Sequence, residues 1–478
     1  MQLKLMEKKQ GIIDRIIDYI FSIKGDFAYL SLIFTIGLIL RIIAAIDLTV
    51  SADDMHHVTH AINFYSAGRL VTYDQSAGLW HAFTSIIYKL FGMTQLSSRL
   101  AALLFGSLSI LVIYLLAREF FNEKIALISA FLLAIAPFHI LNTVAEMDVM
   151  AMFFVLLGML MFIKALKNNK LRYFALSGIF IGLAIYTKVY PLLFIPSLVL
   201  YFAYYKWKEK KRVISKENVK RIFVFLAIVF IFCIPALTHN YLLYKDKGFL
   251  DLQFTRTLGL GKNISAQYYA WDHQFSAKND WAGLIFGSST NSASKIPTLW
   301  AMIEVMRMVD PIVFYLGIIG LIIIFLHKKE NINYIVFFFL SILFVLPFLA
   351  SIILLPKHYL FFEILIIPIG AIALNEINLK LSKISNKNVN KFIFCTILIA
   401  SLILLGLPSI QNIFAPNTYH FYGKSHIEKI IDFKYNEIEK NSLIIADSRI
   451  YRGQINWAFQ ERPYLDGIDF INIMNNKE

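Results

Sequence analysis

A chain of 478 residues with only 16% charged and 58% hydrophobic residues is too apolar for a water-soluble enzyme, in which about 25% of residues are charged. Together with a mean hydropathy of +0.62, this composition predicts a polytopic membrane protein. The net charge of +14 does not indicate nucleic acid, because the basic residues cluster in short gaps between apolar runs, most densely in Lys206–Arg221.

Apolar runs long enough to cross a bilayer, which takes about 17–25 residues, recur along the chain. We therefore expect an all-α polytopic membrane protein with about eleven transmembrane helices. In chain order, the predicted spans lie near residues 27–47, 98–117, 124–140, 148–165, 172–187, 189–205, 222–240, 306–326, 332–355, 358–375 and 392–410.

The distribution of Lys and Arg between successive gaps predicts the orientation of these spans. If the N-terminus is cytoplasmic, the inner gaps carry most of the basic residues, and the short outer gaps carry almost none beyond Lys188 and Lys357. The N-terminus is therefore expected inside and the C-terminus outside.

This orientation divides the chain into three parts. Residues 1–26 are basic and amphipathic and predict a cytoplasmic interfacial helix before an uncleaved first span. Residues 27–410 form the transmembrane domain, with long outer loops at 48–97 and 241–304. Residues 411–478 are expected to form a small extracytoplasmic α/β appendage, in which Ser442–Ser448 reads as a strand.

The first outer loop opens with two adjacent acids in a predicted amphipathic helix, Ser51–Tyr65. Asp53, His56 and His60 fall on a polar face, away from an apolar stripe that begins at Met55. The simplest interpretation is local, because a serine followed three residues later by an acid, here Asp54, is typical of a capping box. Read alone, the acidic pair favours helix capping over catalysis.

A second acidic pair occupies the next outer gap, where Glu146 and Asp148 precede the fourth span. Thr143 and Glu146 also fit a capping box. Asp148 directly precedes a fully apolar run, where a charge costs about 2.5–3.5 kcal/mol, so it should face a cavity or a partner. Two carboxylate clusters on one side of the membrane are harder to explain as two unrelated caps.

Cations are expected at the same outer face. Lys188 lies in a very short outer turn, and Lys357 lies with His358 and Tyr359 at the outer end of the tenth span. These residues could simply extend to the lipid headgroups. Carboxylates and cations that converge on one cavity would also suit a reaction between a hydroxyl and a phosphate, with a general base and fixed positive charges.

The sequence gives little support for a metal site. Cys233 and Cys395 lie inside apolar runs and form no ligand pattern. His56 and His60 have the i,i+4 spacing of zinc ligands, but without a surrounding motif a surface or acceptor-site role is favoured. No cofactor is expected to be required, and a divalent metal is not favoured.

Five blocks of sequence together resemble the GT-C membrane glycosyltransferases, in particular the protein O-mannosyltransferases and aminoarabinose transferases. The order and spacing of the blocks carry the resemblance, which is strong from Arg41 to Lys208 and resumes at Lys357–Ala373. The chain departs from the family at Thr72–Phe83, which has neither the Pro-Pro segment nor a lysine. The blocks are Ala52–Leu70, Ser97–Phe121, Ala126–Leu166, Leu171–Pro196 and Lys357–Pro368.

The resemblance implies an inverting enzyme that moves a sugar from a polyprenyl (dolichyl or undecaprenyl) phosphate to a hydroxyl acceptor, on the outer face of the plasma membrane. Asp53 matches the family's catalytic base and Asp54 its acidic neighbour. We expect the following roles: Asp53 and Asp148 catalytic, Asp54 and Glu146 supporting acids, Lys188, Lys357, His358 and Tyr359 at the donor phosphate, and His56, His57 and His60 at the acceptor.

Two other functions remain open. An oligosaccharyltransferase would share the outer acids and use a divalent ion, but its Trp-Trp-Asp signature is missing from this sequence. A transporter or flippase would be expected to place ionisable residues near the midplane of its spans rather than at their outer ends.

Overall fold

A computed structural model of the chain describes residues 26–258 apart from 71, 73 and 74, and then residues 310–327, 331–345 and 356–382. It also describes short stretches within 396–414 and 433–474 and the single positions 260, 303, 306 and 307. The predicted N-terminal helix and most of the loop at 241–304 lie outside the described residues.

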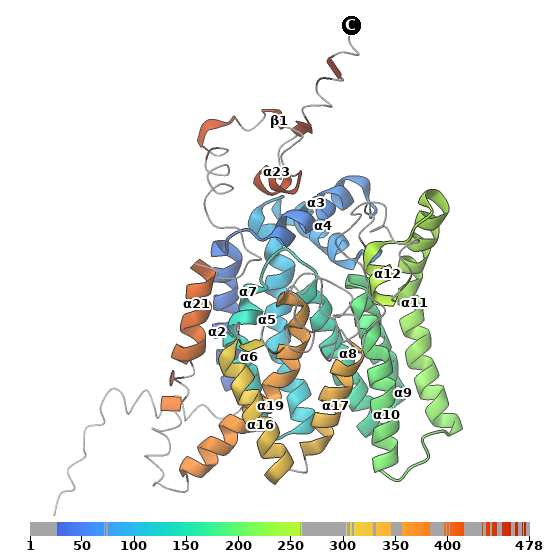
Figure 1. Cartoon of the computed structure of the whole chain (residues 1–478), viewed down its shortest axis with the longest axis vertical. Helices are drawn as coiled ribbons and strands as arrows, with labels where there is room; N and C mark the ends of the chain where they lie inside the picture. Colours follow the sequence, from blue (N-terminus) through green and yellow to red (C-terminus); the bar gives the residue numbers. More distant parts are fainter. Residues whose placement is uncertain are drawn as a thin grey trace, which may run out of the picture.

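The first half of the bundle is built from long apolar helices that alternate in direction (Figure 1). Their order follows the predicted spans up to residue 240. The helices are α2 (Asp26–Asp47), α5 (Gln95–Phe120), α6 (Glu123–Ile135), α8 (Asp148–Asn168), α9 (Leu171–Thr187), α10 (Phe194–Lys208) and α11 (Lys216–Lys247), with the short η1 (Tyr190–Leu193) before α10.

The second half completes the bundle with α16 (Pro311–His327), α17 (Ile332–Leu343) and α19 (Leu360–Ser382), which follows the short η4 (Pro356–Tyr359). A π-helical turn, η5 (Leu402–Gly406), leads into α21 (Leu407–Phe414). Among the described residues, five helices (α2, α5, α8, α11 and α19) are long and apolar enough to cross a membrane. The expected all-α membrane architecture is confirmed at this level.

Among the described residues, the predicted spans at 124–140 and 222–240 differ from the helices observed in ways that the sequence explains. The span at 124–140 divides into α6 and a short helix α7 (Pro137–Leu141), because Pro137 cannot continue α6 and instead starts the next helix. The span at 222–240 is much longer than expected: α11 has 32 residues, begins within the basic run and passes through Pro235.

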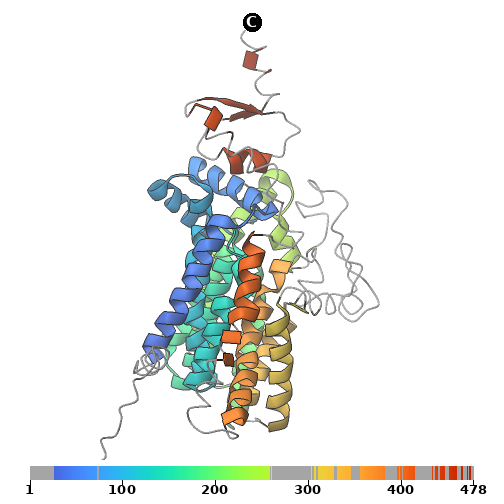
Figure 2. The ribbon, with the colours of Figure 1, turned by 90° about the vertical axis from the view of Figure 1, so that its left-hand side faces the viewer.

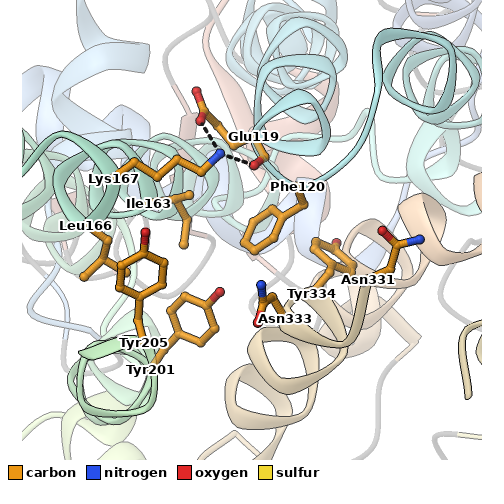
Figure 3. A pocket seen from close by; sticks show the side chains of 10 residues that line it. All are labelled: Glu119, Phe120, Ile163, Leu166, Lys167, Tyr201, Tyr205, Asn331, Asn333 and Tyr334. Carbon is orange, nitrogen blue, oxygen red and sulfur yellow. Dashed lines mark hydrogen bonds and ion pairs between the residues drawn. The ribbon is translucent and has the colours of Figure 1, made fainter. Parts of the chain in front are cut away.

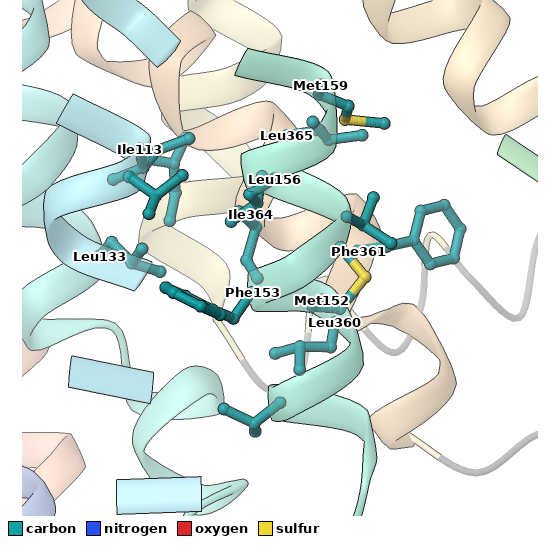
Figure 4. Close-up of a cluster of buried hydrophobic side chains, with 14 of the residues drawn as sticks. Ile113, Leu133, Met152, Phe153, Leu156, Met159, Leu360, Phe361, Ile364 and Leu365 are labelled. Carbon is teal, nitrogen blue, oxygen red and sulfur yellow. The ribbon is translucent and has the colours of Figure 1, made fainter. Parts of the chain in front are cut away.

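The core lies between α5, α6, α8 and α19 (Figure 4). Leu133, Leu156 and Ile364 are fully buried there, and Phe153 packs against Phe105 with 5.1 Å between ring centroids. Helix α9 packs on α8 and α11, so the interior of the bundle is continuous from α19 to α11. Tight packing of this kind holds the helix ends in fixed positions, and it is at the helix ends that the charged residues lie.

Shorter elements cover one end of the bundle (Figures 1 and 2). Helices α3 (Ala52–Ala67) and α4 (Leu79–Phe91) lie across this end. Below them, α7 packs on α2 and α21, and α12 (Leu252–Leu258) packs on η1. Above α3 is α23 (Arg452–Ala458), which in sequence lies between β1 (Ile444–Ala446) and β2 (Tyr464–Asp466). The two strands pair with each other in parallel. The strand expected within Ser442–Ser448 is thus present as β1.

Candidate active site

Helix α3 begins with the capping box predicted from the sequence. The side chain of Ser51 accepts a hydrogen bond from the backbone N–H of Asp54 at 3.0 Å, and the carboxylate of Asp54 accepts one from the N–H of Ser51 at 2.9 Å. The local interpretation of this motif is therefore confirmed. The contacts of Asp54 nevertheless extend well beyond the cap.

Arg99, on the first turns of α5, binds Asp54 with a forked, fully buried ion pair. Its Nη2 lies 2.7 Å from Oδ2 and its Nε lies 3.2 Å from Oδ1. The remaining N–H groups of the guanidinium donate to the carbonyls of Ala45, Leu48 and Thr49 at the end of α2. All five donors of the arginine are used, so α2, α3 and α5 are joined at one point.

The fourth contact of Asp54 reaches the second acidic segment. The backbone N–H of Ala145 donates to Oδ1 of Asp54 at 2.6 Å. With Ser51, Arg99 and Ala145 all donating to it, Asp54 has a partner at each of its four lone-pair positions. Its carboxylate is therefore a structural anchor that connects α3 to the turn before α8, and it is poorly placed to accept a proton from a substrate.

Asp53 precedes Asp54 in the first turn of α3. Its side chain lies outside the described residues, and its role as the catalytic base stays a prediction. The anchor at Asp54 fixes the backbone on which Asp53 is carried.

Asp148 forms an ion pair with Lys188, as expected for an acid that directly precedes an apolar run. Both of its carboxylate oxygens lie 2.7 Å from Nζ of Lys188, and both side chains are buried. Lys188 follows the last residue of α9, and Asp148 is the first residue of α8, so the pair joins two helix ends at the end of the bundle that α3 covers. The carboxylate also stabilises the N-terminal end of the α8 dipole.

Glu146 pairs with Lys357 across a separation of 211 residues, with Nζ 3.1 Å from Oε2 and both groups buried. This pairing overturns the second capping box expected from Thr143 and Glu146. Helix α8 starts only at Asp148, without a side-chain cap, because Glu146 faces a lysine rather than a helix start. Tyr359, in η4 with Lys357, is fully buried, whereas the side chain of His358 lies outside the described residues.

A group of histidines lies on the polar side of α3. Nε2 of His60 is 3.2 Å from Nε2 of His56, and the ring of His57 packs edge-on against Trp80 of α4. His81, also on α4, lies 6.2 Å from His60 between ring centroids and is bonded to the amide of Gln75. Burial and the nearby His60 and His56 lower the pKa of His81 well below its usual value, so this ring is neutral.

Sequence reasoning did not single out Arg99 or His81. Arg99 lies at the start of an apolar run, where a cation is usually explained by the membrane interface. The one feature of the sequence that could have pointed to Arg99 was the adjacent acids Asp53 and Asp54, which call for a cationic partner. Within the described residues, no three His, Cys, Asp or Glu side chains are arranged to hold a metal ion.

A cavity of about 250 Å³ lies at the other end of the bundle (Figure 3). It is lined by Glu119, Lys167, Tyr201 and Asn333 among others, and no sequence-predicted site residue borders it. Lys167 and Glu119, at its rim, pair at the ends of α8 and α5 where the basic residues gather. The cavity is therefore separate from the acidic residues at the end of the bundle that α3 covers.

The bundle of apolar helices, with acids and lysines held at one end below a layer of short helices, has the GT-C fold of membrane glycosyltransferases and oligosaccharyltransferases. The resemblance recognised in the sequence is thus confirmed. A family model described as dolichyl-phosphate-mannose-protein mannosyltransferase matches residues 78–239.

Two solved structures illustrate the likeness. ArnT from Cupriavidus metallidurans bound to undecaprenyl phosphate has a TM-score of 0.59 and 13% identity, with 92% of this chain and 86% of that chain covered. The Archaeoglobus fulgidus oligosaccharyltransferase has a TM-score of 0.58 and 14% identity. The match covers 93% of this chain but only 65% of that longer protein. No curated protein sequence matches the chain.

Proposed function

We propose that this protein is an integral-membrane inverting glycosyltransferase that moves a sugar from a polyprenyl phosphate to a hydroxyl-bearing acceptor. The observation that carries the proposal is the pair of buried ion pairs, Asp148–Lys188 and Glu146–Lys357, at the end of the bundle that α3 covers. Buried carboxylates and cations held this close supply both charges that glycosyl transfer from a phosphate needs.

In the proposed reaction, Asp53 takes the proton of the acceptor hydroxyl, with assistance from Asp148. The acceptor oxygen attacks the anomeric carbon in line, and the bond from that carbon to the phosphate oxygen breaks. The electron pair stays with the polyprenyl phosphate, which gains one negative charge. Lys188 and Lys357 stabilise this charge, together with His358 and Tyr359.

The two ion pairs suit this reaction because they hold the ammonium groups of both lysines in fixed positions before the donor arrives. The donor phosphate can compete with Asp148 and Glu146 for the same ammonium groups. His56, His57 and His60 then line the acceptor side, on α3.

The orientation of the protein in its membrane is part of the proposal. The ends of α5, α8 and α10 that carry Lys and Arg lie opposite to α3, and this side is the cytoplasmic one by the charge rule. The site then faces outward from the plasma membrane. No nucleotide is needed, since the donor's phosphate ester supplies the driving force, and a divalent metal is not favoured.

An oligosaccharyltransferase is the second candidate, favoured by the likeness to the archaeal enzyme. It would transfer a whole glycan and depend on a divalent ion near Glu146 and Asp148. Dependence on metal therefore separates the two candidates.

The experiment is a transfer assay with purified protein and radiolabelled polyprenyl-phosphate sugars. Asp53→Asn and Asp148→Asn should each lower the rate, Asp53→Asn by about 10²–10⁴-fold, the usual contribution of a general base. Glu209→Gln, an acid at the opposite end that pairs with Lys211, is the control and should leave the rate unchanged. Transfer that survives both site substitutions contradicts the mechanism, and loss of transfer in EDTA favours the second candidate.

A further inference from the structure

The C-terminal helix α23 is seated on the outer loop by three separate contacts. Nδ2 of Asn456 donates to Oγ1 of Thr59 on α3 at 2.8 Å. Nε2 of Gln95 at the start of α5 donates to the carbonyl of Trp457 at 2.9 Å. The ring of Trp457 lies over the guanidinium of Arg99, with 5.0 Å from Cζ to the ring centroid. Figure 2 shows α23 directly above α3.

The position of Trp457 follows from the bonding of Arg99. All five N–H donors of the guanidinium, which lie in its plane, are already used by Asp54 and by the backbone carbonyls of Ala45, Leu48 and Thr49. A further partner can therefore approach only a face of the plane, and an aromatic ring is the side chain that binds a cation there. Trp457 is 3% exposed, so it also excludes water from the ion pair.

We propose that Trp457 is a positioning residue for the outer site, through which the C-terminal appendage controls the rate of glycosyl transfer. This inference rests on the proposed function. The ring of Trp457 covers one face of the Arg99 guanidinium and keeps it in position to bind the carboxylate of Asp54. Asp54 in turn accepts hydrogen bonds from the N–H of Ser51, at the start of α3, and from the N–H of Ala145. The two acidic segments of the site are thereby fixed relative to one another.

A second interpretation is that α23 only covers apolar surface, as any docked helix does. The two interpretations differ in what can replace Trp457. A cover needs a large apolar side chain, so Trp457→Leu would serve nearly as well as Trp457→Phe. A contact with the guanidinium face needs an aromatic ring, so phenylalanine should function and leucine should not.

The first measurement is steady-state transfer by the full-length protein, with kcat and the donor KM determined separately. Trp457→Leu should lower kcat about tenfold with KM changed less than twofold, and Trp457→Phe should stay within about threefold of the wild type. The control is Trp207→Leu, since Trp207 is 70% exposed at the other end of the bundle. Equal kcat values for the leucine and phenylalanine variants, whether both high or both low, overturn the proposal.

The second measurement does not depend on activity. Hydrogen exchange of the Ala145 amide, which Asp54 protects, should be about tenfold faster in Trp457→Leu and unchanged in Trp457→Phe. If the wild type transfers no sugar but exchange responds in this way, the proposed function fails and the positioning role stands. If the exchange of Ala145 is the same in all variants, the positioning role is overturned, whatever the activity.

Discussion

The ammonium group of Lys188 lies 2.7 Å from both carboxylate oxygens of Asp148, and both side chains are almost completely buried. A buried pair of this kind contributes little net stability compared with apolar residues of the same size. Removing one partner is costly, however, because the other charge stays buried. The pair at the ends of α8 and α9 is thus not accounted for by a gain in stability, which is consistent with the proposed role in catalysis.

Lys188→Met should lower the free energy of unfolding by about 3–5 kcal/mol, because it leaves the carboxylate of Asp148 buried without its cation. The double variant with Asp148→Asn should recover much of that loss. Thermal unfolding in detergent measures both. The control is Lys167→Met, which removes the half-exposed pair with Glu119 and should cost less than about 1 kcal/mol. A loss for Lys188→Met no larger than for this control would contradict the interpretation.

Lys357→Met should lower kcat about 10²–10³-fold, the usual cost of removing one group that stabilises the charge of a leaving oxygen. Lys357→Arg keeps the charge next to Glu146 and should retain more of the rate. Single-turnover transfer from a polyprenyl-phosphate sugar measures the chemical step directly. Equal rates for the methionine and arginine variants would show that the positive charge at this position is not used.

The local features of the site could be predicted from the sequence, and its long-range pairs could not. The capping box at Ser51 depends on residues three apart, and its pattern alone was sufficient. The same pattern at Thr143 failed, because Glu146 pairs with Lys357, 211 residues away, and no local rule reports that contact. At Glu146, the ion pair with Lys357 replaced the capping interaction that the local sequence favours.

The fold was predictable for a different reason, since apolar runs of sufficient length must become spans. Their ends were less certain where proline or a basic run intervened, as at Pro137 and within α11. Arg99 could not be recognised from its sequence context, because a cation at the start of a span usually reaches the membrane interface. Its role depends on Asp54, which lies 45 residues earlier.

Gly320→Ala should destabilise the protein through the contact between α16 and α19. A Cβ at this position would collide with the backbone carbonyl of Ile369, which cannot move without shifting α19. Overpacking of this kind costs about 1–3 kcal/mol. The matched control is Gly78→Ala. A Cβ added at Gly78 would lie 3.5 Å from its nearest neighbour, Oη of Tyr186, which is an ordinary van der Waals contact. Thermal unfolding should separate the two variants, and equal midpoints would contradict the close packing.

Stability should also depend on the protonation of Asp251, between α11 and α12. Its side chain is buried and accepts a hydrogen bond from Nδ2 of Asn240 at 2.6 Å. Burial raises the pKa of Asp251 to about 6, from an ordinary value of 3.8. The folded protein therefore binds a proton more tightly than the unfolded chain, and the free energy of unfolding falls as the pH rises from about 4 to 6.

The size of this loss is about 3 kcal/mol, since one pKa unit corresponds to about 1.36 kcal/mol. Asp251→Asn carries no charge at any pH and should lack this part of the pH dependence. The measurement is the thermal midpoint of both proteins from pH 4 to 7, compared with Asp246→Asn, whose side chain is 71% exposed. Parallel curves for the wild type and Asp251→Asn would mean that the carboxyl is already ionised at pH 4, and that the hydrogen bonds it accepts from Asn240 and Phe254 outweigh its burial.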